Sequence, residues 1–193
     1  MTTPKHAADR APQPRTIYFT TKAAEITYQQ VKNALLEISD KYPAATKYSF
    51  KYNHKRDHGK PIDVFDNDER GETFINSVRE CADWLIHCGF IETQRKTPDF
   101  RRTAYGHKHA VERWIRNVKN AGCGGDNIPY VPSMAFCVAA WILEIPEHWK
   151  PGYEPSYPLS VRTLNRADYL QRLALSRNEA ANDDQYLWSA NNG

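Results

Sequence analysis

The sequence predicts an α+β protein that is mainly helical, with a winged-helix-like core and a C-terminal helical extension. Apolar side chains recur at intervals of three and four in several stretches, which indicates amphipathic helices. Aromatic and basic residues alternate over residues 46–52, a pattern typical of a half-exposed strand. The order helix, strand, loop, helix, strand and basic tip over residues 27–105 is compatible with a winged helix.

The first predicted helix begins after Thr27. Thr27 and Gln30 have the spacing of a capping box, and apolar residues at helical spacing follow until Pro43 stops the helix. The preceding residues 1–22 are rich in Thr, Pro, Ala and charge without any period. We therefore expect them to form a mobile arm, which ends in a short strand at 16–20.

The middle of the winged-helix-like region is predicted to hold two strands, a loop and a helix. Gly89 suits the position after a helix end, because glycine adopts the left-handed backbone conformation without strain. Pro98 and Asp99, flanked by cations, indicate a turn at the tip of a basic hairpin. The elements are a strand at 46–52, a long polar loop at 53–71, a helix at 72–88, a strand at 90–93 and the hairpin tip at 94–102.

Two further helices complete the single globular domain that we expect over residues 23–150. The helix at 106–120 has one apolar and one basic side, and the helix at 133–144 is so uniformly apolar that it should be the centre of the core, Trp141 included. Closely spaced prolines then favour an extended connector, and Asn165 is a good N-cap for a last helix. The remaining segments are the connector and a helix at 165–181, packed on the domain and together spanning 151–181, and a tail at 182–193.

The composition excludes several classes of protein. The 193 residues are 40% hydrophobic and include 5 Trp, 11 Tyr and 7 Phe, enough for a core that hides roughly 70% of the unfolded surface. The longest apolar stretch, ten residues from Met134 to Leu143, is half of the roughly 20 that span a bilayer. The N-terminal residues lack the apolar segment of a secretory signal. We expect a cytoplasmic protein without membrane contact, whose four cysteines are buried thiols.

The strongest functional signal is a basic block from Arg95 to Lys119. It holds eight cations and two acids, a net charge of +6 over 25 residues, whereas the whole chain carries +3. Such clustering favours a phosphate backbone as partner, because each neutralised phosphate releases a condensed counterion. A solvated helix face and an acidic protein surface are the alternatives. The candidate binding residues are Arg95, Lys96, Arg101, Arg102, Lys108, Arg113, Arg116 and Lys119.

The helix at 72–88 is a poor candidate for reading a DNA groove. Three acidic side chains against one arginine give it a net charge of −2, where a groove-reading helix needs donors and positive charge. If nucleic acid is bound, we expect the tip and the basic face of the 106–120 helix to bind it, mostly through phosphates. Trp114 is expected to belong to the core and not to a stacking surface.

Other chemistry receives little support from the residue spacing. An acidic cluster begins like a calcium loop, but Arg70 and Ser77 stand where oxygen ligands belong. Two histidine pairs could join Cys88 or Cys123 on zinc, but Gly59 and Pro61 oppose the helix that the first pair would need, and the second pair opens a helix on faces about 200° apart. Cys123 could also pair with a histidine of the second pair as a nucleophile, but no family context supports this. No metal or cofactor is therefore predicted. The acidic cluster is Asp63, Asp66, Asp68, Glu69 and Glu72, and the histidine pairs are His54 with His58 and His107 with His109.

Two segments carry a family resemblance. Tyr105-Gly-His-Lys-His-Ala-Val-Glu-Arg-Trp114 and the later segment from Tyr130 to Trp141, about a fifth of the chain, resemble a pairing found in small uncharacterised proteins of bacterial phages and plasmids. Ser133-Met134 departs from the Asn-Gly of that pattern. The resemblance implies an origin in a mobile element and names no activity.

These observations together predict a non-catalytic accessory protein of a bacterial mobile element that binds nucleic acid mainly through phosphate contacts. The alternative is a protein that inhibits or modulates a host or defence complex, in the manner of an anti-CRISPR protein. It would present the basic block, or the Pro/Tyr strip at 149–157, to an acidic protein surface within a larger complex. A metal-dependent hydrolase is the third hypothesis.

Overall fold

The computed structural model describes residues 21–47, 59–94, 96–119, 130–150, 153–160 and 162–166, and within these ranges the protein is mainly helical. Isolated antiparallel bridges join Thr103 and His148 to Ser156, and these described ranges contain no strand. The elements are α1 (Thr21–Ala24), α2 (Tyr28–Lys41), the 3₁₀ helix η1 (Pro61–Phe65), α3 (Asp68–His87), α4 (Ala104–Trp114), the π-helical turn η2 (Ile115–Lys119) and α5 (Ser133–Ile142).

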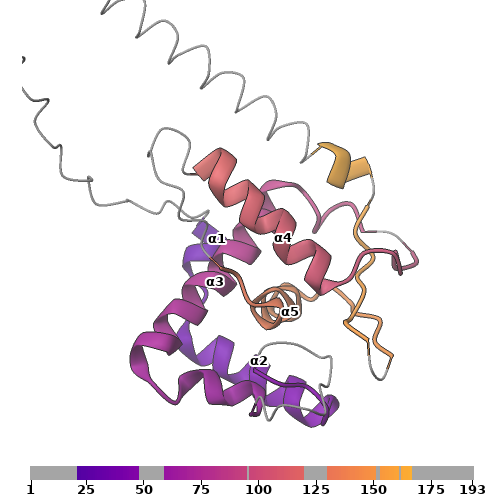
Figure 1. Cartoon of the computed structure of the whole chain (residues 1–193). Helices are drawn as coiled ribbons and strands as arrows, with labels where there is room; N and C mark the ends of the chain where they lie inside the picture. The colour runs from indigo at the N-terminus through magenta and orange to yellow at the C-terminus, as the bar shows by residue number, and fades with distance from the viewer. Residues whose placement is uncertain are drawn as a thin grey trace, which may run out of the picture.

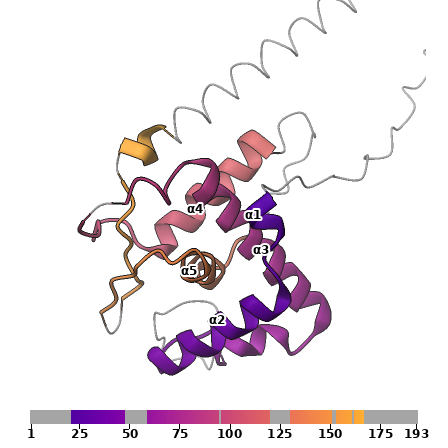
Figure 2. The same cartoon turned by 180° about the vertical axis from the view of Figure 1, so that it is seen from behind.

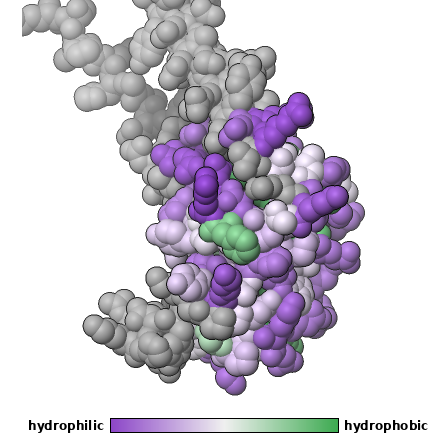
Figure 3. Space-filling model, turned by 90° about the vertical axis from the view of Figure 1, so that its right-hand side faces the viewer, coloured by the Kyte–Doolittle hydropathy of each residue, from purple (hydrophilic) through white to green (hydrophobic). Residues whose placement is uncertain are grey.

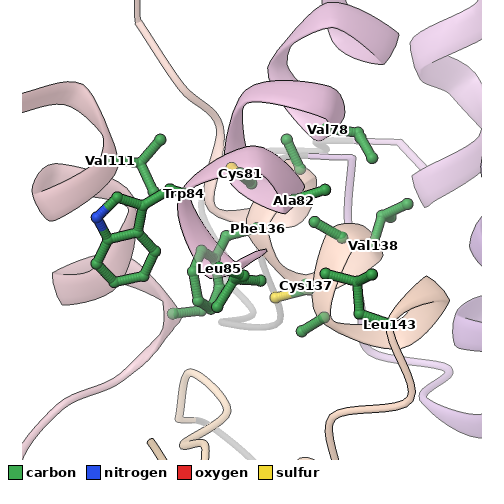
Figure 4. Close-up of a cluster of buried hydrophobic side chains, with 14 of the residues drawn as sticks. Val78, Cys81, Ala82, Trp84, Leu85, Val111, Phe136, Cys137, Val138 and Leu143 are labelled. Carbon is green, nitrogen blue, oxygen red and sulfur yellow. The ribbon is translucent and has the colours of Figure 1, made fainter. Parts of the chain in front are cut away.

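Helix α5 is the centre of the fold, with α2, α3 and α4 arranged around it (Figure 1). The opposite view shows α2, α3 and α4 around α5 again, with the extended connector on the remaining side (Figure 2). Residues 133–140 of α5 are all buried, which confirms the core position that its apolar composition predicts. Phe136 of α5 belongs to the same apolar cluster as Trp84 of α3 and Val111 of α4, and its ring centroid lies 6.2 Å from that of Trp84 (Figure 4).

Trp141 is not at the centre of the core, where the sequence predicts it. The ring is only half-buried, because it lies at the C-terminal end of α5, where the helix reaches the surface. Its Nε1–H donates to Glu37 Oε2 over 2.7 Å, and the Lys41 ammonium lies 4.9 Å from the ring centroid. The side chain therefore packs at the boundary between α5 and α2.

Helix α2 begins where its capping box predicts. The Gln30 backbone N–H donates to Thr27 Oγ1 over 3.2 Å, and the Thr27 N–H donates to Gln30 Oε1 over 2.8 Å. Two of the donors that a helix N-terminus leaves unpaired are thus satisfied reciprocally.

The predicted loop at 53–71 is wrong in its second half. Residues Pro61–Phe65 form η1, and α3 begins at Asp68, four residues earlier than expected. Asn67 explains the early start, because its side chain accepts from two backbone N–H groups of the first turn. A Cβ at Gly71 would lie 2.7 Å from Phe65 Cδ1, so only glycine lets η1 pack this closely on α3.

The predicted strand at 90–93 is also wrong, because these residues form the C-terminal cap of α3. Gly89 has a φ of +71°, the Phe90 N–H donates to Leu85 O, and the Gly89 N–H donates to Ile86 O, each over 3.0 Å. This is the Schellman arrangement, in which an apolar residue after the glycine folds back on the helix. Phe90 is buried with its ring 4.7 Å from that of Trp84.

The strand required on one side of a winged-helix hairpin is therefore absent from residues 90–93. Most of the other predicted strand, at 46–52, and the strand at 16–20 lie outside the described residues. Helix α4 begins two residues before the predicted start. Residues 162–166 are helical, and the rest of the predicted 165–181 helix lies outside the described residues, as do the arm and the tail.

Candidate nucleic-acid interface

The basic tip is a turn that projects two side chains into solvent. The Arg102 N–H donates to Asp99 O over 3.0 Å, and the Arg101 N–H donates to Asp99 Oδ1 over 3.1 Å. Aspartate commonly occupies the first position of such a turn, where its carboxylate accepts from the backbone two residues on. Phe100 and Arg101 fill the central positions and are exposed, Phe100 to 61%.

The turn is anchored to the proline-rich connector, which brings a lysine and a histidine to it. The Asp99 N–H donates to Tyr157 O over 3.3 Å, and the Ala104 N–H donates to Pro155 O over 2.8 Å. The Lys150 ammonium consequently lies 5.5 Å from the Phe100 ring centroid. The His148 ring meets the edge of the same ring at 6.0 Å.

We call this region the tip surface. Figure 3 shows the side of the molecule that carries it, where hydrophilic side chains surround a small hydrophobic patch. In the part of the chain that the structure describes, none of its lysines and arginines forms an ion pair. The residues of the tip surface are Lys96, Phe100, Arg101, Arg102, His148 and Lys150.

Lys150 and His148 were not among the candidates from sequence. The sequence shows a single lysine and a single histidine among prolines and aromatics, without any local clustering of charge. Two links bring them beside Phe100: the hydrogen bonds from the turn to the connector, and the reciprocal backbone hydrogen bonds between His148 and Ser156, each 2.8 Å long. The packing of the connector on the core, with Tyr157 and Leu159 buried, is what holds this arrangement.

A second basic region lies along the outward face of α4. Tyr105 and Arg113 are exposed and His109 is half-buried, and their spacing of four residues places them on one side of the helix. Arg116, exposed in the π-helical turn, continues the same side. The rise from residue 105 to 116 is about 16 Å. This α4 face adjoins the tip surface, because Arg102 precedes α4 by two residues.

Lys108 does not belong to either basic region. Its side chain is buried, with a residue exposure of 3%, and its ammonium forms an ion pair with Glu112 Oε1 at 2.9 Å. The Glu112 carboxylate also accepts from the Val131 N–H over 3.0 Å and contacts His109 Nδ1 at 2.6 Å. Burial acts to raise the pKa of Glu112, but these three neighbours outweigh it and leave the pKa below its ordinary value. Lys108 is therefore a structural cation and not a phosphate contact.

The predicted block is thus divided by the fold. Lys96, Arg101 and Arg102 are together in the tip segment, and Arg113 and Arg116 are together at the far end of α4. Arg95 and the side chain of Lys119 lie outside what the structure describes. Trp114 is buried, as expected for a core residue.

The acidic cluster has a structural role in the described residues. Asp63 accepts from the Lys60 N–H over 2.6 Å, and Asp68 and Glu69 stand in the first turn of α3, where negative charge favours the helix dipole. His107 and His109 diverge, because His107 stacks on Phe136 at 5.2 Å inside the core. Among the described residues, no group of three or more His, Cys, Asp or Glu side chains is placed to hold a metal ion.

The cysteines that the structure describes are buried in the core, in agreement with the prediction. Cys81, Cys88 and Cys137 are buried, and burial raises the pKa of Cys81 and of Cys137 well above the ordinary thiol value. Cys123, His54 and His58 lie outside the described residues.

A separate cleft of about 470 Å³ lies between η1, α3 and Tyr130, and its lining mixes both signs of charge. No helix of the described residues is long and apolar enough to span a membrane.

Comparisons with family models, with curated proteins and with solved structures found no match for this chain.

Proposed function

We propose that the protein is a non-catalytic accessory protein that binds nucleic acid, mainly through phosphate contacts at the tip surface and the α4 face. The observation that carries the proposal is that the lysines and arginines of the tip surface form no ion pair within the described residues. Arg101 and Arg102 stand beside an exposed phenylalanine without a carboxylate partner among the described residues. The origin in a mobile element, which the sequence resemblance implies, remains part of the proposal.

The contrast with two paired lysines of the fold supports this proposal. Lys41 pairs with Glu147 at 2.7 Å and Lys108 pairs with Glu112, so the fold does provide carboxylates where a cation has a structural role. Unpaired cations that a turn holds together repel one another, and a polyanion relieves that repulsion while releasing its own counterions. The tip surface therefore has the charge distribution of a phosphate-binding region.

The binding mode that the geometry favours has little sequence preference. Helix α3, the expected groove-reading helix of a winged-helix protein, contributes most of its length to the core, including Trp84 and Leu85. Its first turn carries Asp68 and Glu69, which a DNA groove would repel. The proposal thus rests on phosphate contacts, and a winged-helix arrangement is not needed for it.

The proposal is tested by the double variant Arg101→Ala/Arg102→Ala, titrated with labelled DNA and RNA at about 50 and about 200 mM salt. Loss of two phosphate contacts should weaken binding at least about tenfold at the lower salt. It should also reduce the slope of log K against log salt by about 1.4 to 1.8. The melting temperature should stay close to that of the natural sequence, because both side chains reach solvent.

The matched control is Lys22→Ala/Arg70→Ala, which removes two exposed cations from α1 and α3. It should leave the slope nearly unchanged. An equal loss in the control would show that net charge and not the tip surface drives binding. Failure of the natural sequence to bind any nucleic acid would contradict the proposal and favour the alternative, in which this surface meets an acidic protein.

A further inference from the structure

Two exposed tyrosines lie over the buried Lys108. Tyr105 is 55% exposed at the start of α4, and Tyr130 is 65% exposed just before α5. The Lys108 ammonium lies 5.4 Å from the centroid of the Tyr105 ring and 4.5 Å from that of the Tyr130 ring. The two centroids are therefore within about 10 Å of each other, close enough to contact one base or two neighbouring bases.

The support beneath the rings is rigid. Lys108 is held by Glu112, and Glu112 is held in turn by the Val131 N–H and by His109. The His109 ring also meets the Tyr105 ring at right angles, with centroids 4.6 Å apart. A ring that is fixed before binding loses little conformational entropy when a ligand stacks on it. These tyrosines are thus exposed and at the same time positioned.

Positive charge continues beside this aromatic pair. Arg113 and Arg116 are exposed on the α4 face, about 12 and about 16 Å along the helix from Tyr105. Aromatic rings interleaved with cations are the usual means of binding a single strand, in which bases stack on the rings and phosphates meet the cations. In a duplex the faces of the bases are already stacked on one another, so flat exposed rings would gain nothing from it.

We infer that Tyr105 and Tyr130, supported by Lys108, form a stacking platform for unpaired bases, so that the nucleic acid bound is single-stranded. This inference rests on the proposed function and adds the strand state of the ligand. DNA and RNA present the same chemistry to such a platform, because both offer base faces and phosphates, and the titrations separate the two.

The test uses Tyr105→Leu and Tyr130→Leu, which keep an apolar cover over Lys108 but remove the aromatic face. Each variant is titrated with four labelled ligands of about 20 nucleotides: single-stranded DNA, single-stranded RNA, duplex DNA and a single strand that contains an abasic stretch. The natural sequence should prefer a single strand to the duplex. Each substitution should weaken single-strand binding by about 5- to 100-fold, leave the salt slope unchanged, and change duplex and abasic binding less than about twofold.

Tyr28→Leu is the matched control, because Tyr28 is an exposed tyrosine on α2 whose ring packs on Phe65 and, within the described residues, on no cation. It should leave all four affinities unchanged. The inference is overturned if the platform variants bind single strands as the natural sequence does, or lose affinity equally for the abasic strand. Either result would overturn the stacking platform alone. The proposed function would still hold, because the natural sequence would still bind nucleic acid. If the natural sequence binds none of the four ligands, the proposed function itself fails.

Discussion

His107 should make the stability of the protein depend on pH in a way that one substitution removes. Its side chain is 2% exposed, its ring stacks on Phe136, and Nε2 has no hydrogen-bond partner among the described residues. Burial lowers the pKa of His107 to about 4, with Arg102 adding to the lowering and Asp99 opposing it. The folded protein therefore keeps this ring neutral in a range where the unfolded chain protonates it.

The sign and the size of this pH dependence follow from the difference in bound protons between the folded and the unfolded chain. Between about pH 6.5 and about pH 4 the unfolded chain binds more protons than the folded chain, so stability falls as the pH falls through this window. The full difference in pKa corresponds to about 3 kcal/mol. From pH 7 to pH 4.5 the protein should lose about 2 kcal/mol through this group.

The assay is urea unfolding at about pH 7 and about pH 4.5 for the natural sequence and for His107→Phe. Phenylalanine has a similar shape and does not titrate, so the variant should lose about 2 kcal/mol less on acidification, with a change at pH 7 below about 1.5 kcal/mol. His87→Phe, at an exposed histidine of α3, is the control and should retain the pH dependence. Equal acid sensitivity in His107→Phe and the natural sequence would refute the reasoning.

Two further predictions concern the ion pair and the core. Glu112→Gln should lower the free energy of unfolding by about 3 kcal/mol, because it leaves the Lys108 ammonium buried without its counter-charge. Adding Lys108→Met should recover part of that loss, and a double-mutant cycle with coupling below about 0.5 kcal/mol would contradict the pairing. Phe136→Ala should cost about 3 to 5 kcal/mol in urea unfolding, and Trp141→Ala distinctly less, because the Trp141 ring is half-buried. A reversed order would show that Trp141 is the more important core residue.

Local patterns predicted the elements whose signals lie within a few residues. The capping box at Thr27, the uniformly apolar α5 and the glycine after α3 are all as expected, because caps and helical faces are decided by neighbours in sequence. The prediction of a strand after Gly89 is wrong because the local pattern there is ambiguous. An apolar run of this length suits both a strand and the residue that a Schellman cap folds back on its helix, and only the contact with Trp84 decides between them.

The candidate interface likewise combines a feature that the sequence determines with features that only long-range packing determines. The sequence by itself established that cations are concentrated in a short stretch of the chain, and that this charge exceeds the net charge of the protein. The tertiary structure decided which of them face solvent: it buried Lys108 against Glu112, separated the tip from Arg113, and brought Lys150 to Phe100 from the connector. Burial and long-range pairing depend on how helices and connectors pack, and no local charge count contains that information.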